Sequence, residues 1–340
     1  MKKAVIVLQT TGLMLLIVLF IIFSAKAKPQ TINGMKMCVN IIIPSLLPIL
    51  ILTNTAIKSE ISTVFEFVLT PIARILKLSP PAMCAIIFGL VGGYPTGAIL
   101  AEQLLEHGEI DDSTARRLLR FNFCGGIAFI ITAVGTIKLN STKTGVVIYI
   151  TNLLSSIIVC VIESLFEKKK PCIFSRTSKQ NLSSALVDSV EVSTKSIAMM
   201  CGYIIFFSAL SGLFTIPKLF MPLIEITNGI FSANQIISLP YLCFFLSFGG
   251  FCIHFQLIGI IKKTNMSYFD FFIHRLAGGI ISYFLGKGYI LAFAPKQEVF
   301  SNISQITPIA SEINSSLSIM LLASCVIIVV DLHNKKSRLI

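Results

Sequence analysis

The segment at residues 89–98, GLVGGYPTGA, concentrates glycine and proline inside an apolar stretch. Such a segment cannot sustain a regular helix, so backbone N–H and C=O groups lose their helical partners. In hydrocarbon, irregular backbone is tolerated only inside protein or against a wet cavity. Freed amides beside a helix end can hold an anion. We therefore predict a small-molecule site here, formed by Gly92, Gly93, Tyr94, Pro95, Thr96 and Gly97. The alternative is a kink that allows close helix packing.

A second candidate segment, residues 219–232, carries a carboxylate among apolar neighbours at Glu225, followed by Thr227 and Asn228. A carboxylate is costly in a membrane unless it is paired or hydrated, so Glu225 is a candidate for binding a coupling ion. Thr227 and Asn228 are candidate substrate contacts. The alternative is that the segment lies at the membrane interface and Glu225 faces water.

The third candidate segment is FGGFCIHFQ at residues 248–256. Gly249 and Gly250 predict a second helix break, and His254 and Gln256 follow it. Histidine titrates near neutral pH, so His254 could shuttle a proton or hydrogen-bond a substrate. The alternative for His254 is a plain hydrogen bond between helices.

Two isolated residues complete the candidate set. Asn122 precedes a Gly-Gly pair and could face the same cavity as the first segment. Arg275 opens an apolar run, where it could contact an anion or act as an anchor at the membrane interface. We favour the anchor for Arg275.

The composition indicates the solvent in which these segments lie. Apolar types make up 54% of the 340 residues and charged types only 13%, and the mean hydropathy is +0.85. Soluble chains carry about 25% charged residues. The apolar residues also come in runs of about twenty, the length that crosses a hydrocarbon core of ~30 Å. The sequence therefore predicts an all-α integral membrane protein whose principal partner is the lipid bilayer.

Hydropathy predicts about nine transmembrane helices plus two short half-helices. The spans are expected near residues 4–25, 37–57, 82–101, 122–140, 145–166, 196–216, 236–261, 269–292 and 315–331, and the half-helices near 62–78 and 219–232. The first span follows a basic start. It is longer than the 7–15-residue core of a cleaved signal peptide, so we expect it to be retained.

The order of these elements predicts two similar halves with glycine-broken helices, residues 37–166 and 196–331. Each half runs span, proline-bearing short segment, broken span, polar loop and two further spans. Transporter folds are often built from such repeats, and interrupted helices at matching positions mark the binding site. Coincidence is the alternative, because glycine is common in membrane helices. Around the halves we place an N-terminal span and linker (1–36), a basic cytoplasmic linker (167–195) and a cytoplasmic tail (332–340).

Several function classes are not expected. The formal charge of +12 is spread between the apolar runs, as in cytoplasmic loops of membrane proteins, so we expect no nucleic-acid partner. There is no Walker A, HExxH or GxSxG motif, so we expect no enzyme. The nine cysteines show no CxxC pair and no zinc spacing, so we expect no metal and no cofactor.

Three pieces in order carry a resemblance to a known family. The run from residue 89 to 121, GLVGGYPTGAILAEQLLEHGEIDDSTARRLLRF, is similar to the nucleoside-recognition (Gate) domain of sporulation integral membrane proteins. LIEITNGIF (223–231) and LSFGGFCIHFQ (246–256) resemble the second half of its YlbJ/SpoVV type. The resemblance covers roughly residues 37–290. One departure is the stretch NFCGGI at 122–127, where the family usually has several asparagines and a terminal proline.

The resemblance implies a role in spore maturation and a plan similar to that of concentrative nucleoside transporters. It implies a secondary transporter or facilitator for a small anionic metabolite, with dipicolinic acid as first choice, in the outer forespore membrane. Ion-coupled nucleoside transport and a non-transporting role in spore envelope assembly stay open as alternatives. By motif position, Gly93, Tyr94, Pro95 and Gly97 would line the first broken helix. Glu225, Thr227, Asn228, Gly249, Gly250, His254 and Gln256 would line the second half.

Overall fold

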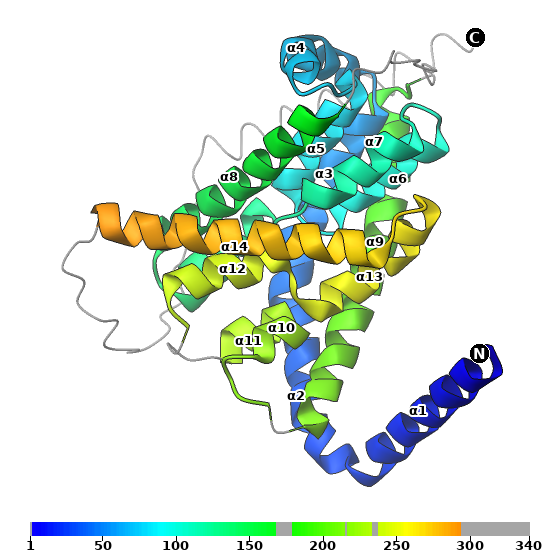
Figure 1. Ribbon diagram of the computed structural model, residues 1–340, viewed down its shortest axis with the longest axis vertical. Coiled ribbons are helices and arrows are strands. Elements are labelled where there is room, and N and C mark those ends of the chain that lie inside the picture. Colours follow the sequence, from blue (N-terminus) through cyan, green and yellow to red (C-terminus); the bar gives the residue numbers. More distant parts are fainter. Residues whose placement is uncertain (1, 168–178, 215, 233–236, 294–340) are drawn as a thin grey trace.

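The computed structural model describes residues 2–167, 179–214, 216–232 and 237–293, and these residues form helices and no β-strand (Figure 1). Two of the helices, η1 and η2, have π-helical hydrogen bonding. In chain order the elements are α1 (Lys2–Ile22), α2 (Ser24–Met37), η1 (Cys38–Ile42), α3 (Ile43–Lys58), α4 (Ile61–Ile75), α5 (Pro80–Gly92), α6 (Thr96–Glu106), α7 (Asp112–Phe121), η2 (Ala128–Lys138), α8 (Thr142–Phe166), α9 (Leu182–Leu213), α10 (Met221–Ile224), α11 (Ile226–Ser232), α12 (Leu239–Phe248), α13 (Gly250–Lys263) and α14 (Tyr268–Phe293).

Five helical stretches are long and apolar enough to cross a membrane in the described part of the chain. They are Ser24–Lys58, Thr142–Phe166, Leu182–Leu213, Leu239–Ile261 and Tyr268–Phe293. The bent pair α4 and α5, which meet at 100°, makes a sixth if it is counted as one span. A multi-pass helical membrane protein is thus confirmed, whereas the predicted count of nine spans and the two similar halves are not. The predicted span at 315–331 lies outside the described residues.

The differences in span count have local causes. α2, η1 and α3 form one helix of 35 residues, so the polar stretch that predicted a linker before residue 37 is helical. Small residues allow this stretch to pack tightly on α9, because a Cβ on Gly34 would lie 2.8 Å from the Ser208 Oγ atom and one on Gly212 would lie 3.1 Å from the Ala27 Cα atom. The predicted span at 122–140 is instead a non-helical stretch at 122–126 followed by the 11-residue helix η2.

The helices form two crossed sets. The long α2–α3 helix and α9 run side by side, and α8, α12 and α14 pack on one another and lie across them (Figure 1). The helix α1 leaves the bundle at an elbow and projects away from it (Figure 1). The candidate segments lie where the two sets meet.

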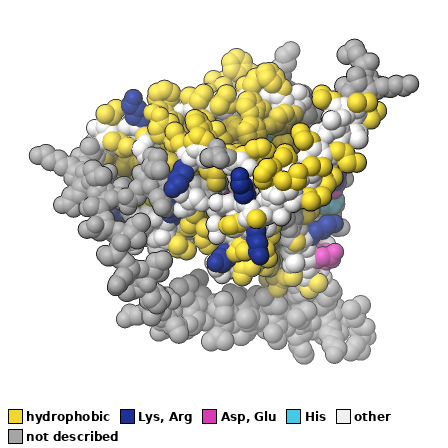
Figure 2. Space-filling view, turned by 90° about the horizontal axis from the view of Figure 1, so that it is seen from below, with side chains coloured by type: hydrophobic (Ala, Val, Ile, Leu, Met, Phe, Trp, Pro, Cys, Tyr) yellow, Lys and Arg dark blue, Asp and Glu magenta, His cyan; other side chains and the backbone are white. Residues whose placement is uncertain are grey.

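The outer surface is apolar, as expected for contact with lipid. Figure 2 shows one face on which hydrophobic side chains predominate and charged side chains are scattered. Phe67 on α4 is 81% exposed and Leu8 on α1 is 74% exposed. Burying such surface in hydrocarbon stabilises the protein by about 25 cal/mol per Å², so this surface favours a bilayer environment over water.

Candidate functional site

The first predicted break divides residues 80–106 into two helices. α5 begins with two prolines behind Ser79, whose hydroxyl accepts a hydrogen bond from the Ala82 N–H at 3.2 Å. The helix ends at Gly92, because Gly93 has φ +80° and ψ −171°, a conformation open essentially to glycine alone. After the cis Tyr94–Pro95 bond, α6 begins at Thr96. The helix break predicted from glycine and proline is thereby confirmed.

The non-helical stretch 122–126 packs against this break. The Tyr94 N–H donates to the Cys124 carbonyl oxygen at 3.1 Å. The Asn122 side chain donates to the Ala85 carbonyl oxygen at 3.0 Å. A Cβ on Gly97 would lie 2.2 Å from the Asn122 carbonyl oxygen, so backbone meets backbone here. Asn122 therefore packs into the first break, whereas the prediction that it faces a cavity is not met by the lining of the cavity described below. The glycines serve close packing at this point.

The second break separates α12 from α13. Gly249 has φ +94° in the left-handed region and its N–H donates to the Phe245 carbonyl oxygen at 2.8 Å. Gly250 follows with φ +68°, and a Cβ there would lie 2.7 Å from the Pro222 carbonyl oxygen. The predicted break at this glycine pair is confirmed, and it packs against α10.

The two breaks meet at Tyr94. The Tyr94 hydroxyl group, buried at 6% exposure, donates to the Leu246 carbonyl oxygen in the last turn of α12 at 3.1 Å. A Cβ on Gly249 would lie 3.7 Å from the Tyr94 ring. Segments 152 residues apart in sequence are thus joined at one tyrosine.

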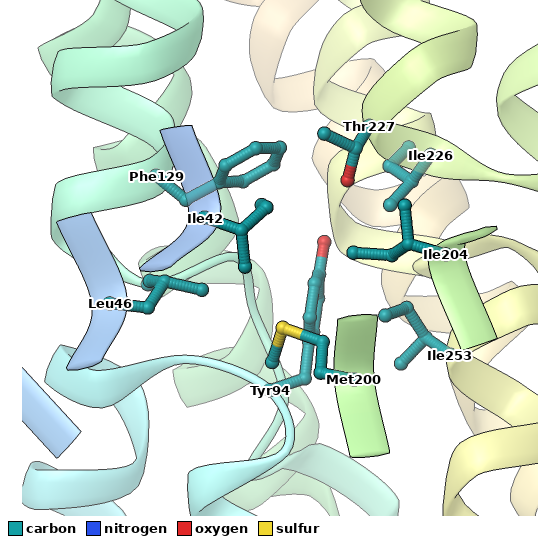
Figure 3. A pocket seen from close by; sticks show the side chains of 10 residues that line it. Ile42, Leu46, Tyr94, Phe129, Met200, Ile204, Ile226, Thr227 and Ile253 are labelled. Carbon is teal, nitrogen blue, oxygen red and sulfur yellow. The ribbon is translucent and has the colours of Figure 1, made fainter. Parts of the chain in front are cut away.

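A small cavity lies beside this junction (Figure 3). Its volume is about 20 Å³, enough for about one water molecule. Tyr94 and Thr227 direct their hydroxyl groups toward each other across the space between Ile42 and Ile204 (Figure 3). The lining residues are Ile42, Leu46, Tyr94, Gly126, Phe129, Met200, Ile204, Ile226, Thr227 and Ile253. Of the predicted site residues, Tyr94 and Thr227 line the cavity. The apolar lining residues could not be predicted, because in the sequence they look like ordinary core residues.

His254 lies close to the second break and stabilises it through two hydrogen bonds. Its Nε2 atom lies 3.1 Å from the Phe248 carbonyl oxygen, which only accepts, so Nε2 carries the proton. The Nδ1 atom then accepts from the Tyr268 hydroxyl at 3.2 Å. With both nitrogens bonded and the residue 0% exposed, His254 satisfies a carbonyl freed by the break. This geometry favours the hydrogen bond between helices over a proton shuttle.

Glu225 caps a short helix. Its carboxylate oxygens accept from the Thr227 N–H at 2.8 Å and from the Asn228 N–H, at the start of α11. The Asn228 side chain donates to Gln30 at 2.9 Å and accepts from Ser232 at 3.0 Å. Glu225 and Asn228 are thus engaged within the protein, and coupling of an ion to Glu225 stays a prediction. Gln256 is 8% exposed and its Oε1 atom has no hydrogen-bond partner among the described residues.

Arg275 differs from its expected place. The residue is 4% exposed, so it is not an interface anchor. Its Nη1 donates to the Phe123 carbonyl oxygen at 2.8 Å and its Nε to that of Phe248 at 3.4 Å. The anchor was predicted because Arg275 lies near the start of a span; the span begins where expected, at Tyr268, but its first turns pack on the two breaks, so that Arg275 lies between Phe123 and Phe248. No group of metal-binding side chains occurs among the described residues.

Fold and site together define a multi-pass helical membrane protein in which two interrupted helices meet at a buried polar junction. The chain is similar to the sporulation integral membrane protein YlbJ of Bacillus subtilis (strain 168), with 24% identity over 300 residues that cover 73% of this chain and 74% of the relative. The resemblance to the YlbJ type inferred from the motifs is thereby confirmed. No protein-family profile and no solved structure matches the chain.

Proposed function

We propose that this protein is a secondary transporter or facilitator for a small anionic metabolite and has no enzymatic activity. The observation that supports this is the junction itself: two interrupted helices, α5–α6 and α12–α13, meet at Tyr94 beside a cavity. Interrupted helices in membrane proteins place freed backbone dipoles where a substrate can use them. An assembly factor needs no such interruption.

The structure corresponds to a closed conformation in this scheme. A cavity of about 20 Å³ cannot hold a metabolite of a dozen heavy atoms, so the lining must part for the substrate to enter. The lining comes from η1, α3, η2, α9, α11 and α13, as well as from Tyr94 at the first break and from Gly126. Movement of the α2–α3 and α9 pair against the broken helices would open it.

Dipicolinic acid is our first candidate for the substrate. The similar protein of Bacillus subtilis is named for sporulation, which supports a role in spore formation, and the outer forespore membrane is the location that we propose. Dipicolinate is a dianion at neutral pH, and moving one charge across 100 mV changes the free energy by about 2.3 kcal/mol. Two charges give about 4.6 kcal/mol, a gradient of roughly a thousandfold. A facilitator without a coupling ion would then suffice to move it out of a negative compartment.

Uptake of labelled dipicolinate into proteoliposomes under an imposed potential tests the proposal. We expect saturable, potential-dependent uptake that excess nucleosides do not block. Block by nucleosides would favour the nucleoside alternative. No uptake above protein-free vesicles, from protein that is monodisperse and helical, would refute transport and favour an assembly role.

A matched pair of variants connects the uptake to the cavity. Thr227→Val removes a cavity hydroxyl with little change in volume and is expected to change the apparent affinity for dipicolinate. Thr70→Val makes the same change on α4, where the hydroxyl group donates only to the Glu66 carbonyl oxygen of its own helix at 2.7 Å, and is expected to leave uptake unchanged.

A further inference from the structure

Arg275 is a buried cation without a carboxylate partner among the described residues. It is 4% exposed, and the ion pairs of the described chain involve other residues. Its Nη2 atom is fully buried and has no hydrogen-bond partner there. Arginine carries five N–H donors and stays charged in proteins. Two of these donors, on Nη2, are therefore unused in the described structure.

The position of Arg275 relates this free group to the junction. Arg275 bonds Phe123 and Phe248, while Tyr94 bonds Cys124 and Leu246. Both residues thus bridge the same two segments, the non-helical stretch 122–126 and the last turn of α12. The guanidinium group also lies over the Phe123 ring, 5.2 Å from its centroid. Gly126, in the same non-helical stretch, lines the cavity.

Other arginines show how the protein usually satisfies this side chain. Arg120 pairs with Glu163 at 2.7 Å and with Asp270 at 2.8 Å. Arg117 is 3% exposed; both of its Nη atoms donate to carbonyl oxygens just after α4, at 3.1 and 2.7 Å, and only its Nε atom has no partner among the described residues. Arg275 has one carbonyl on Nη1, a long contact on Nε and none on Nη2.

A buried charge is costly unless it is paired. The carbonyl oxygen at the C-terminal end of α12 and the Phe123 ring offset part of that cost, since both present partial negative charge. They do not neutralise a full charge, and they leave the two N–H groups of Nη2 without an acceptor among the described residues. A carboxylate can accept from such N–H groups through charge-assisted N–H···O bonds.

We propose that Arg275 is the specificity-determining residue of the site and that its Nη2 group binds a carboxylate of the substrate. This inference rests on the proposed function and narrows it to carboxylates. Neutral nucleosides offer no such group. When a carboxylate binds, it competes with the carbonyl oxygens of Phe123 and Phe248 for the guanidinium group, so binding would loosen the link between the two breaks.

The test measures binding to purified protein separately from transport. Three related pyridine probes of decreasing charge are compared: pyridine-2,6-dicarboxylate, pyridine-2-carboxylate and neutral pyridine-2,6-dimethanol. We expect the wild type to prefer them in that order. Arg275→Gln should lower the affinity for the dicarboxylate by about tenfold to a hundredfold, the range for a hydrogen bond to a charged group. The affinity for the dimethanol should stay unchanged, so the preference for charged probes disappears.

Arg117→Gln is the matched control, because it removes another buried, carbonyl-bound guanidinium group. It should lower stability and leave the preference as in the wild type. If Arg275→Gln does not fold, Arg275→Lys decides, since lysine keeps the charge and loses the planar fork. A lysine variant that binds the dicarboxylate as the wild type does would overturn the proposal.

The two proposals fail in different ways. Binding with the expected preference but no uptake into proteoliposomes would refute transport and support the assignment of Arg275. Uptake of dipicolinate by the wild type together with a folded Arg275→Gln variant of unchanged preference would support transport and refute the role of Arg275. Wild-type protein without a preference for charge also refutes that role.

Discussion

We expect Gly93→Ala to destabilise the protein more than a substitution at an exposed position would. The backbone of Gly93 has φ +80° and ψ −171°, which costs an alanine about 1–3 kcal/mol. A Cβ there would also lie 2.1 Å from the Gly126 nitrogen, so the stretch 122–126 must shift, at a further cost of about 1–3 kcal/mol for overpacking. Together these give about 2–6 kcal/mol of destabilisation.

The assay is thermal unfolding of purified protein in detergent. At about 2–4 °C per kcal/mol, the melting temperature of Gly93→Ala should fall by at least about 4 °C. Gly202→Ala is the control: no atom lies within 4 Å of a Cβ there, and alanine favours helix over glycine by about 1 kcal/mol, so Tm should stay or rise. A Gly93→Ala protein with the same melting temperature as the wild type would refute the described backbone of the break.

Three further predictions concern polar groups. Tyr94→Phe removes the bond to the Leu246 carbonyl oxygen and should lower stability by about 1–3 kcal/mol, because a buried acceptor is left unpaired; unchanged Tm would contradict the link between the breaks. Arg120→Met removes an ion-pair partner from two partly buried carboxylates, which keep only His274, and should lower Tm clearly more than Lys263→Met, because exposed ion pairs such as those of Lys263 contribute little in water. Glu225→Gln should leave the pH dependence of dipicolinate uptake unchanged, because the structure engages the carboxylate as a helix cap; a flattened pH profile would show ion coupling instead.

The local features of the site could be predicted because they are written in short stretches of sequence. Gly93 and Pro95 end α5 for local reasons, since glycine readily adopts a positive φ and proline lacks an N–H. The Gly249–Gly250 pair gave the second break for the same reason. Long apolar runs likewise gave α8 and α14, because a run of about twenty such residues has few structures open to it in a bilayer.

Other features were beyond the sequence. The polar stretch between the first two predicted spans reads as a linker, yet Gly34 and Gly212 let it pack on α9 as part of one helix. Gly34 lies 174 positions before its partner Ser208, and Gly212 lies 185 positions after its partner Ala27. The asparagines show the same limit, since Asn228 faces Gln30 and Asn122 faces Ala85. Nothing near either residue in the sequence indicates these partners.

By itself, the sequence determined that this protein is helical, that it lies in a membrane and that two of its helices break, because composition and backbone conformation are local properties. Only the tertiary structure decided that the breaks meet at Tyr94, that His254 and Glu225 are engaged within the protein and that Arg275 lies buried between them. The partners of Arg275 are carbonyl groups 152 and 27 residues away. Every residue type offers such a carbonyl, so no pattern of side chains can indicate which one an arginine will meet.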